Sequence, residues 1–365
     1  MREGAKMRIL HFISDIGIAN GVMSVVYNYF CAMPDDVKFD IMYFHQTEDN
    51  READINALGG NIYKVSSPTN IPKFLNDMDV FFKAHKGEYS AVHIHAPQLT
   101  TLIAIKARKY GIKNIISHCH TAVYSLSKKK VWFNKTLNFP TRCMADVCIA
   151  PSDMAGKVWF KKKYILMKNA IVCDTYKFNA DTRDIKRKQL NIENKYSVIQ
   201  TGKTTKEQKN HKFTFRVFAE LVKQKPDSVL LLAGGEKTEE LDNLAKSLGI
   251  EKNIMYLGTR TDIPELLMAA DAFILPSTSE GLLIAAIEAQ ASGLAGIISD
   301  RVPDEVCITP NISVMSLETE PIKWTERLIK ISNANIKREM WCQEVIKAGW
   351  DIHDNAKQLL KIYGG

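Results

Sequence analysis

The chain has 365 residues, of which 45% are hydrophobic and 25% are charged. This composition is typical of a globular protein, and the length exceeds what one core usually supports, so we expect two domains. Seven scattered cysteines without a C-x-x-C pair argue against a disulfide framework or a zinc site. No run approaches the ~18 apolar residues of a membrane span and no signal peptide is evident, which predicts a cytoplasmic protein.

The positive charge is concentrated in the first half of the chain. Residues 1–172 hold 23 Lys/Arg and 14 Asp/Glu, whereas the remainder holds 26 and 27. Lysine runs at 128–130 and 161–163 have aromatic residues beside them, which favours an anionic membrane surface as a partner and a peripheral location. A solvated lysine face is the simpler alternative for either run. No nucleic-acid-binding signature accompanies the charge, so nucleic acid is not expected as a partner.

Apolar runs alternate with amphipathic stretches along the whole chain, which predicts an α/β protein built on parallel sheets. The first half is expected to form strands at 7–13, 39–44, 91–95, 114–117 and 147–150, and helices at 22–33 and 100–110. The second half is expected to form strands at 196–202, 228–235, 253–258, 272–275 and 295–299, and helices at 211–225 and 238–248.

The domain boundaries follow from this repetition. A polar segment, 173–195, separates the two halves and is the expected hinge. We therefore predict a first domain over 1–172, a second over 173–345, and a final helix over 346–365 that packs back on the first domain. Two such halves imply a ligand-binding cleft between them.

The stretch 276–293 carries the strongest functional signal. An apolar strand leads into a polar turn with Glu280 and Gly281, followed by a helix that carries Glu288 and stops at Gly293. The free N–H groups at such a helix start bind phosphate, and Gly281 lets the anion approach. Glu280 and Glu288 lie on either side of this phosphate site, so one could bind the sugar and the other the ribose of a nucleotide-sugar. An amphipathic helix with two solvated glutamates is the alternative.

Four segments together resemble glycosyltransferase family 4. Glu280 to Glu288 reproduces its Glu-x7-Glu motif, and 208–211 is similar to its phosphate-side lysine segment. Residues 116–120 resemble its histidine strand end, and 150–156 the close of its first domain. The resemblance spans nearly the whole chain and is nearest to bacterial enzymes of capsular and extracellular polysaccharide synthesis. It implies the GT-B architecture, with two Rossmann-like parallel-sheet domains facing a cleft.

The resemblance also implies roles for residues in the second half. Glu288 would bind the ribose hydroxyls and Glu280 the transferred sugar. The basic pair that neutralises the departing diphosphate matches Lys209 and Lys203, with Lys206 as the alternative partner. Further donor-binding residues are implied, with weaker support for the last two: Gly281, Leu282, Leu283, Gly258 and Arg260. Lys203 stands where the family usually has arginine, and Leu283 where it often has proline.

In the first half, the resemblance points to two loops. Gly17, Asn20 and Gly21 lie where the family has a glycine-rich loop near the diphosphate and acceptor, and glycine there permits positive φ. His120 matches the family's cleft histidine, while His118 is expected beside it. The alternative for both is a hydrogen-bonded histidine at a strand end.

The implied activity is a retaining, metal-independent transfer of a hexosyl unit from a UDP-sugar to a saccharide or lipid-linked acceptor. No cofactor and no metal site are expected. Two alternatives remain: another GT-B enzyme such as a nucleotide-sugar epimerase or phosphorylase, and a non-catalytic GT-B subunit that binds a partner glycosyltransferase.

Overall fold

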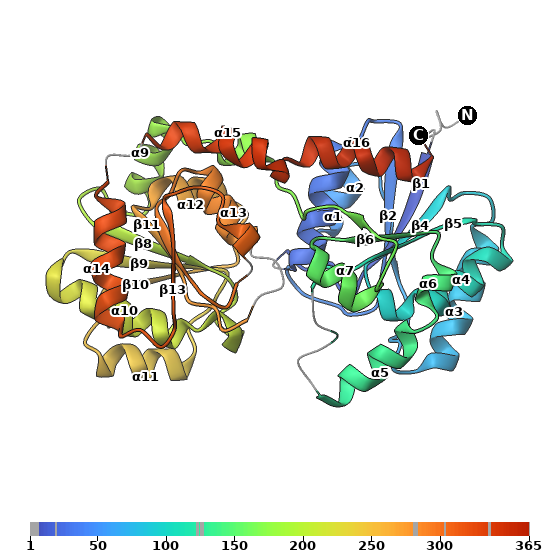
Figure 1. The fold of residues 1–365 in the computed structure, drawn as a ribbon, viewed down its shortest axis with the longest axis horizontal. Coiled ribbons are helices and arrows are strands. Elements are labelled where there is room, and N and C mark those ends of the chain that lie inside the picture. The colour runs from blue at the N-terminus through green and yellow to red at the C-terminus, as the bar shows by residue number, and fades with distance from the viewer. Residues whose placement is uncertain are drawn as a thin grey trace. The chain divides into compact units, whose positions relative to one another are not determined.

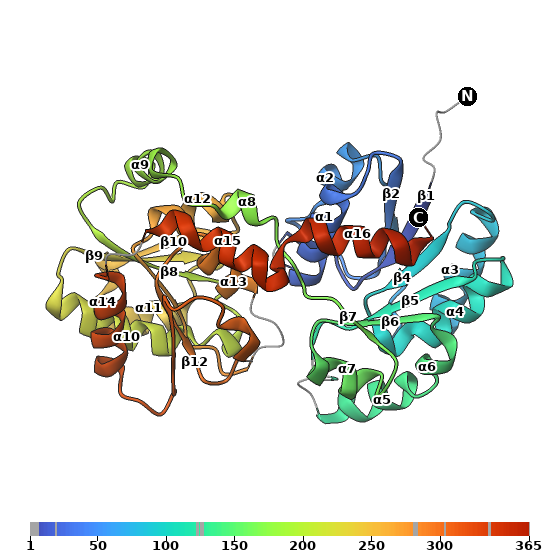
Figure 2. The same cartoon turned by 45° about the horizontal axis from the view of Figure 1, so that its top comes forward.

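The computed structural model describes residues 7–18, 20–121, 124, 128–279, 284–302, 304–334 and 337–364. The chain divides into two compact units. The first unit contains the chain up to Ala170 together with the residues from Ile352 onward, and the second is Ile171–Asp351. Figures 1 and 2 show a central sheet with helices on its faces in each unit. Within the described residues, no helix is long and apolar enough to cross a membrane.

The sheet of the first unit has seven parallel strands in the order β3-β2-β1-β4-β5-β6-β7. The strands are β1 (Met7–Phe12), β2 (Val37–Tyr43), β3 (Ile62–Lys64), β4 (Ala91–Ile94), β5 (Asn114–His118), β6 (Val147–Ala150) and β7 (Ile165–Leu166). The helices are α1 (Gly21–Ala32), α2 (Glu52–Ala57), α3 (Ile71–Ala84), α4 (Thr100–Lys109), α5 (Lys128–Asn138), α6 (Thr141–Met144), α7 (Asp153–Trp159) and α16 (Ile352–Tyr363).

The sheet of the second unit has six parallel strands in the order β10-β9-β8-β11-β12-β13. The strands are β8 (Tyr196–Thr201), β9 (Ser228–Ala233), β10 (Ile254–Gly258), β11 (Ala272–Leu275), β12 (Gly296–Ser299) and β13 (Ile312–Met315). The helices are α8 (Cys173–Tyr176), α9 (Ala180–Gln189), α10 (His211–Gln224), α11 (Glu239–Ser247), α12 (Ile263–Ala269), α13 (Ile284–Ala291), α14 (Pro321–Ser332) and α15 (Trp341–Val345).

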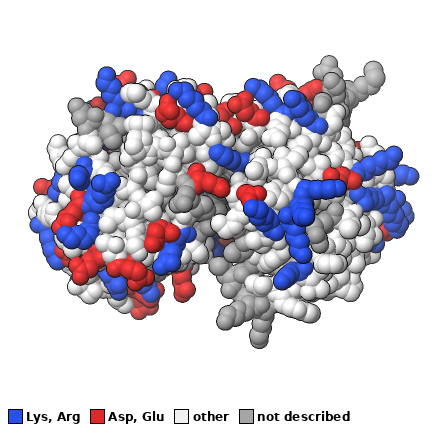
Figure 3. All heavy atoms as spheres, in the orientation of Figure 1, with Lys and Arg blue, Asp and Glu red and all other residues white. Residues whose placement is uncertain are grey.

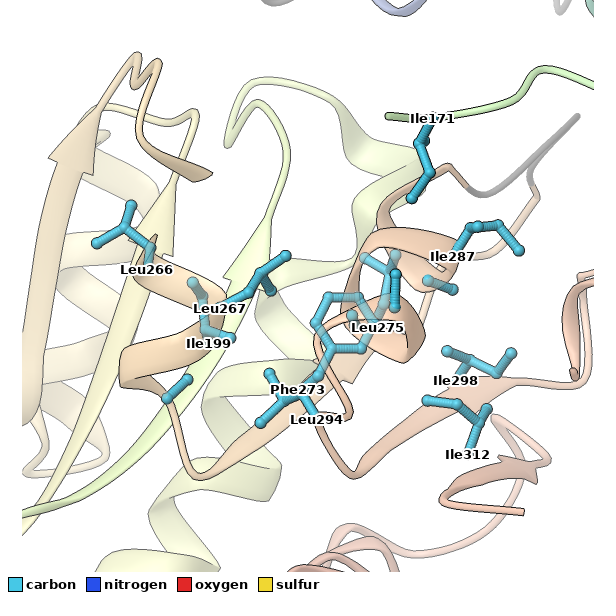
Figure 4. Close-up of a cluster of buried hydrophobic side chains, with 14 of the residues drawn as sticks. Ile171, Ile199, Leu266, Leu267, Phe273, Leu275, Ile287, Leu294, Ile298 and Ile312 are labelled. Carbon is cyan, nitrogen blue, oxygen red and sulfur yellow. The ribbon is translucent and has the colours of Figure 1, made fainter. Parts of the chain in front are cut away.

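Both faces of the second sheet are buried, which explains why its strands read as nearly continuous apolar runs. Alternate residues of a strand point to opposite faces, so Ile199 and Phe273 pack on one side while Val198 and Ile274 pack on the other. Figure 4 shows the first of these two clusters, in which residues of α12 and α13 contact the sheet. The parallel arrangement aligns the carboxyl ends of all six strands along one edge.

The surface charge differs between the units. On the face drawn in Figure 3, acidic and basic side chains are interspersed over the second unit, on the left. Blue lysine and arginine side chains gather over the first unit, on the right. This matches the excess of basic residues counted in the first 172 positions.

The polar segment 173–195 is not a bare hinge, and that prediction was wrong. It forms α8 and α9, which belong to the second unit and pack against α12. Arg187 is buried and donates to the carbonyl oxygens of Ala269, Ile192 and Lys195 at 2.8, 2.9 and 2.6 Å. Polar side chains of this segment therefore donate hydrogen bonds to buried backbone carbonyl oxygens. The amino-acid composition of the segment does not reveal this role.

The helical tail is divided at Gly349, which has φ +79° within a π-helical turn. Residues before it pack in the second unit, whereas α16 belongs to the first unit and contacts α1. Asn355 donates to the carbonyl oxygen of Lys168 at 2.8 Å, and Asn114 donates to that of Ile362 at 2.8 Å. The chain passes from the first unit to the second after Ala170 and returns to the first after Asp351. The sequence analysis predicted these two boundaries after residues 172 and 345.

Candidate active site

The loops after β8, β9 and β10 meet at the carboxyl edge of the second sheet. The Gly202 N–H donates to the carbonyl oxygen of Ala233 at 2.8 Å, and the Gly234 N–H donates to that of Gly258 at 2.7 Å. Gly234 has φ +99°, and a Cβ there would lie 3.2 Å from the backbone of Gly202. Glycine is therefore needed for these loops to approach each other so closely.

Lys209 lies above this edge at the end of a short 3-10 helix, Glu207–Lys209, that precedes α10. Its aliphatic chain covers Gly202, because a Cβ at Gly202 would lie 2.9 Å from the Lys209 Cε. Gln200, on β8, donates to the Lys209 carbonyl oxygen at 2.8 Å. Sequence reasoning missed Gln200, whose only signal is a polar residue inside an otherwise apolar strand.

The other two lysines differ from Lys209 in their surroundings. Lys203 is partly buried in the loop after β8, and Lys206 is exposed. The Lys206 N–H donates to the Lys203 carbonyl oxygen at 3.1 Å, which closes the turn between them. The pairing of Lys203 or Lys206 with Lys209 stays a prediction.

Glu288 is a partly buried carboxylate on α13. Its Oε1 accepts a hydrogen bond from the Tyr176 hydroxyl at 2.7 Å. Burial raises the pKa of Glu288, while the hydrogen bond from Tyr176 and the positive charge of Lys209 oppose the rise. Glu288 and Lys209 are thus close enough to interact electrostatically. Tyr176 lies in the segment assigned to the hinge, so no sequence pattern pointed to it.

His211 begins α10 next to this pair. Burial and the charge of Lys209 lower the pKa of His211 to about 4, so its ring is neutral at neutral pH. Both ring nitrogens are buried without a hydrogen-bond partner among the residues that the structure describes. A buried ring with two unmatched polar atoms is a place where a ligand or water molecule supplies the missing bonds.

Four nominated residues, Glu280, Gly281, Leu282 and Leu283, lie outside the described residues. The chain before them is held by a hydrogen bond from the Thr278 N–H to the Gln208 carbonyl oxygen, at 2.8 Å. Ser277 is buried and its carbonyl oxygen accepts from the Ser299 hydroxyl. The loop therefore leaves β11 beside the lysine segment.

Gly258 and Arg260 follow β10. Gly258 has φ +65° and accepts the hydrogen bond from Gly234 described above. The Arg260 guanidinium binds Asp262 through Nε at 2.7 Å and through a terminal nitrogen at 2.5 Å. This pairing places the guanidinium at the start of α12.

In the first unit, Asn20 serves as the N-cap of α1. Its Oδ1 accepts from the N–H groups of Val22 and Met23 at 2.8 and 3.2 Å, and its Nδ2 donates to Asp15 at 2.6 Å. Gly21 does not have the positive φ that the sequence analysis expected, because it already lies in the helix. A Cβ at Gly21 would meet nothing within 4 Å, whereas one at Gly17 would lie 3.0 Å from the Thr47 hydroxyl.

Five buried histidines line one face of the first sheet, at the carboxyl ends of β1, β4 and β5. They are His11, His93, His95, His118 and His120. The register pairs His11 with His93, and residues two apart on a strand share a face, so all five point to the side covered by α16. The Tyr363 hydroxyl of α16 lies 2.6 Å from His93 Nδ1.

These imidazoles form two hydrogen-bonded chains. His11 Nδ1 lies 3.0 Å from His95 Nε2, and His95 Nδ1 lies 2.7 Å from His120 Nε2. His120 Nδ1 lies 3.2 Å from the Asn169 Oδ1, which can only accept. In the second chain, His118 Nδ1 lies 3.1 Å from His93 Nε2.

Burial keeps these imidazoles neutral. It lowers the pKa of His11 to about 3 and that of His120 to about 4, and it lowers the pKa values of the other three well below 6.5. Sequence analysis nominated only His118 and His120 and missed the rest of the cluster. The signal was available, because His-x-His occurs at the ends of two neighbouring strands, 93–95 and 118–120.

Comparison with known proteins agrees with this architecture. HepE of Anabaena, solved with UDP-glucose, superposes with a TM-score of 0.77 at 16% identity, over 97% of this chain and 98% of HepE. The protein therefore has the GT-B fold. Residues 181–347 match the family model of glycosyl transferases group 1.

Two sequence relatives extend the match. EpsF of Bacillus subtilis, named as a glycosyltransferase, is 28% identical over 99% of this chain and 97% of EpsF. An Escherichia coli enzyme named UDP-Gal:alpha-D-GlcNAc-diphosphoundecaprenol alpha-1,3-galactosyltransferase is 24% identical over 76% of each chain. The group 1 glycosyltransferase family model thus matches the second unit, and EpsF is similar to this chain over nearly its whole length.

Proposed function

We propose that this glycosyltransferase moves a hexosyl unit from a UDP-sugar to a lipid-linked or saccharide acceptor in surface polysaccharide synthesis, with retention of the anomeric configuration. The observation that carries the proposal is the partly buried Glu288, which accepts a hydrogen bond from Tyr176 and interacts electrostatically with Lys209. UDP-glucose in HepE and the diphosphoundecaprenol acceptor named for the E. coli relative support the donor and acceptor classes.

In the proposed reaction, the bond between the anomeric carbon and the β-phosphate oxygen breaks, and the acceptor oxygen attaches to the same face of the sugar. Lys209, with Lys203 or Lys206, neutralises the charge that develops on the leaving diphosphate, which takes up the proton of the acceptor hydroxyl. Glu288 accepts from the ribose hydroxyls, and Glu280 contacts the sugar. The ammonium groups of these lysines supply the stabilisation of the diphosphate, and no metal ion has a role in this step.

The proposed roles of the remaining residues are specific to their positions. Backbone N–H groups of Gly281, Leu282 and Leu283 bind the sugar and the diphosphate. Asn20 and Gly21 contact the donor, and Gly17 contacts the acceptor. Asn169 fixes the His120 proton on Nδ1, so Nε2 accepts from a sugar hydroxyl in exchange for its hydrogen bond with His95. Gly258 and Arg260 flank the base.

The replacement Glu288→Gln tests the donor site. The amide keeps the shape and still accepts from Tyr176, but it loses a charge-assisted bond to the ribose worth about 1.5–3 kcal/mol. UDP-glucose and UDP-galactose affinity, measured by calorimetry, should fall about 10- to 100-fold. Glu239→Gln, on the exposed start of α11, is the matched control and should bind as the wild type does. Unchanged affinity in Glu288→Gln would show that the donor site is elsewhere.

We also propose that α5 rests on an anionic membrane surface. Trp132 and Lys135 lie about one turn apart on α5, and Phe139 follows directly after the helix. Trp132 and Phe139 are 73% and 71% exposed. The lysines at 161–163 are exposed as well. An exposed apolar stripe with basic residues binds the interface of anionic bilayers.

Vesicle co-sedimentation tests the membrane contact. Trp132→Ser with Phe139→Ser should weaken binding to phosphatidylglycerol vesicles at least about tenfold, since burying each aromatic is worth about 1.5–3 kcal/mol. Val80→Ser, at a residue 62% exposed on α3, should have no effect. Equal binding to neutral phosphatidylcholine vesicles, or an unaffected double variant, would refute this contact.

A further inference from the structure

The histidine cluster of the first unit contains a buried nitrogen without a hydrogen bond beside a hydrogen-bonded pair of histidines. His118 Nε2 is buried and has no hydrogen-bond partner among the described residues. His95 Nδ1 and His120 Nε2 face each other at 2.7 Å. His95, His118 and His120 each offer one nitrogen, and these nitrogens lie within 4.8 Å of one another. The rings stack closely, with 4.3 Å between the centroids of His118 and His120.

The second nitrogen of each of these rings is already held. His95 Nε2 bonds His11, His118 Nδ1 bonds His93, and His120 Nδ1 bonds the Asn169 carbonyl oxygen. Metal-binding histidines are oriented in this way, by a partner on the nitrogen that does not bind the ion. An ion at His95 Nδ1 and His120 Nε2 would break the hydrogen bond between them and require the His95 proton to move to Nε2, which then donates to His11 Nδ1.

We propose that His95 Nδ1, His118 Nε2 and His120 Nε2 bind a divalent transition-metal ion of the Zn²⁺ type. Imidazole suits Zn²⁺, Cu²⁺ and Ni²⁺, and three histidines with one water molecule make a common tetrahedral zinc site. Two nitrogens bound to one tetrahedral Zn²⁺ at about 2.0–2.1 Å lie about 3.3–3.4 Å apart. The 2.7 Å separation between His95 and His120 therefore needs to open by only about 0.7 Å.

Two further observations select this triad over the neighbouring group His11, His93 and His95, whose nitrogens also lie within 4.8 Å. Binding an ion at the proposed triad breaks one hydrogen bond, the one between His95 and His120, whereas binding at the neighbouring group breaks one bond of His93 and one of His95. His120 and His95 are also the two most exposed of the five rings, at 9% and 8%.

The site goes beyond the proposed transfer reaction. Because the ligands come from the ends of β4 and β5, a bound ion ties these two strand ends together and should raise the unfolding temperature of the first unit. His120 Nε2 is also the atom that the proposed function assigns to the donor sugar, so the metal-bound state should be inactive. The expected loss of activity rests on the proposed function, whereas metal binding itself does not. The binding experiment uses no substrate, so the two can fail separately.

The experiment is a metal titration of the tag-free full chain after removal of bound metal with EDTA and desalting. Zn²⁺ should bind with one ion per chain, and Co²⁺ in its place should give the intense visible absorption of a tetrahedral complex. These two measurements use the wild type and do not depend on any variant folding correctly. Absence of one-to-one Zn²⁺ binding, or an octahedral Co²⁺ spectrum, would overturn the proposal.

Variants then assign the ligands. His118→Asn and His120→Asn should each weaken Zn²⁺ binding more than Asn169→Ala, which disturbs only the orientation of His120 and should cost about 10- to 100-fold. His85→Asn, at a histidine outside the cluster that pairs with Glu88, is the matched control and should bind normally. Circular dichroism establishes that each variant is folded. Binding that survives in His120→Asn but is lost in His11→Asn would show that the neighbouring group is the site.

Discussion

Replacing Lys209 by alanine is expected to lower kcat about 10²- to 10³-fold, with a smaller effect on the affinity for the UDP-sugar. The charge on the diphosphate grows as the sugar leaves, so a cation placed there stabilises the transition state more than the ground state. The path of Lys209 over Gly202 and its charge interaction with Glu288 place its ammonium group near the proposed ribose site. Steady-state transfer of sugar from UDP-glucose or UDP-galactose measures the effect.

Two control variants make this prediction specific. Lys209→Arg retains the charge with a different shape and should recover part of the activity. Lys206→Ala removes an exposed lysine three residues away and should retain most of the activity if Lys203 is the partner of Lys209. A loss in Lys206→Ala as large as in Lys209→Ala would instead identify Lys206 as that partner. Full activity in Lys209→Ala would refute the proposed role.

The second large effect is expected with pH: the first unit should lose much of its stability between pH 6.5 and pH 5.5. The folded pKa values of the five histidines lie below 6.5, so the unfolded chain takes up protons first as the pH falls. Their contribution is fully present above pH 6.5 and is lost as the pH falls toward the folded values. Between pH 6.5 and 5.5 each unfolded histidine goes from half to about nine-tenths protonated, so each contributes about 1 kcal/mol and the five together about 5 kcal/mol.

That loss is comparable to the whole stability of a typical domain, about 5–15 kcal/mol, so it should be easy to detect. Hydrogen exchange of peptides, measured at pH 7.5 and 5.5 in EDTA and corrected for intrinsic rates, follows each unit separately. Protection of the amides of β1, β4 and β5 should fall at pH 5.5. Protection of the second unit should change far less, because His211 is the one histidine in its sequence. Equal changes in both units would contradict the explanation.

The sequence predicted the sheet framework well because the central strands are buried on both faces. β11 was predicted with its observed bounds, since its four apolar residues stand between Asp271 and Pro276. The edge strands β3 and β7 were missed because they have only three and two residues. β13 was missed because only half of it is buried, so it does not read as an apolar run. The segment 173–195 was misread because its arginines bond backbone carbonyls that only the folded chain brings near.

The candidate site was predictable only in part for a similar reason. Glu288 and Lys209 belong to motifs that can be recognised locally. Tyr176, which holds Glu288, lies 112 residues away, and Asn169, which holds His120, lies 49 residues away. No local pattern predicts such partners. Likewise, His11 is an isolated histidine in an apolar run, and only the pairing of β1 with β4 brings it to the others.

The position of α16 has a consequence for biosynthesis. This helix covers the histidine face of the first unit, yet it is made only after the whole second unit, Ile171–Asp351. At about 5–20 residues per second, the ribosome takes roughly 10–40 s to cover that distance. During this interval the nascent first unit exposes the surface that Leu359 and Tyr363 later bury. The first unit therefore completes its fold only after the second unit has been synthesised.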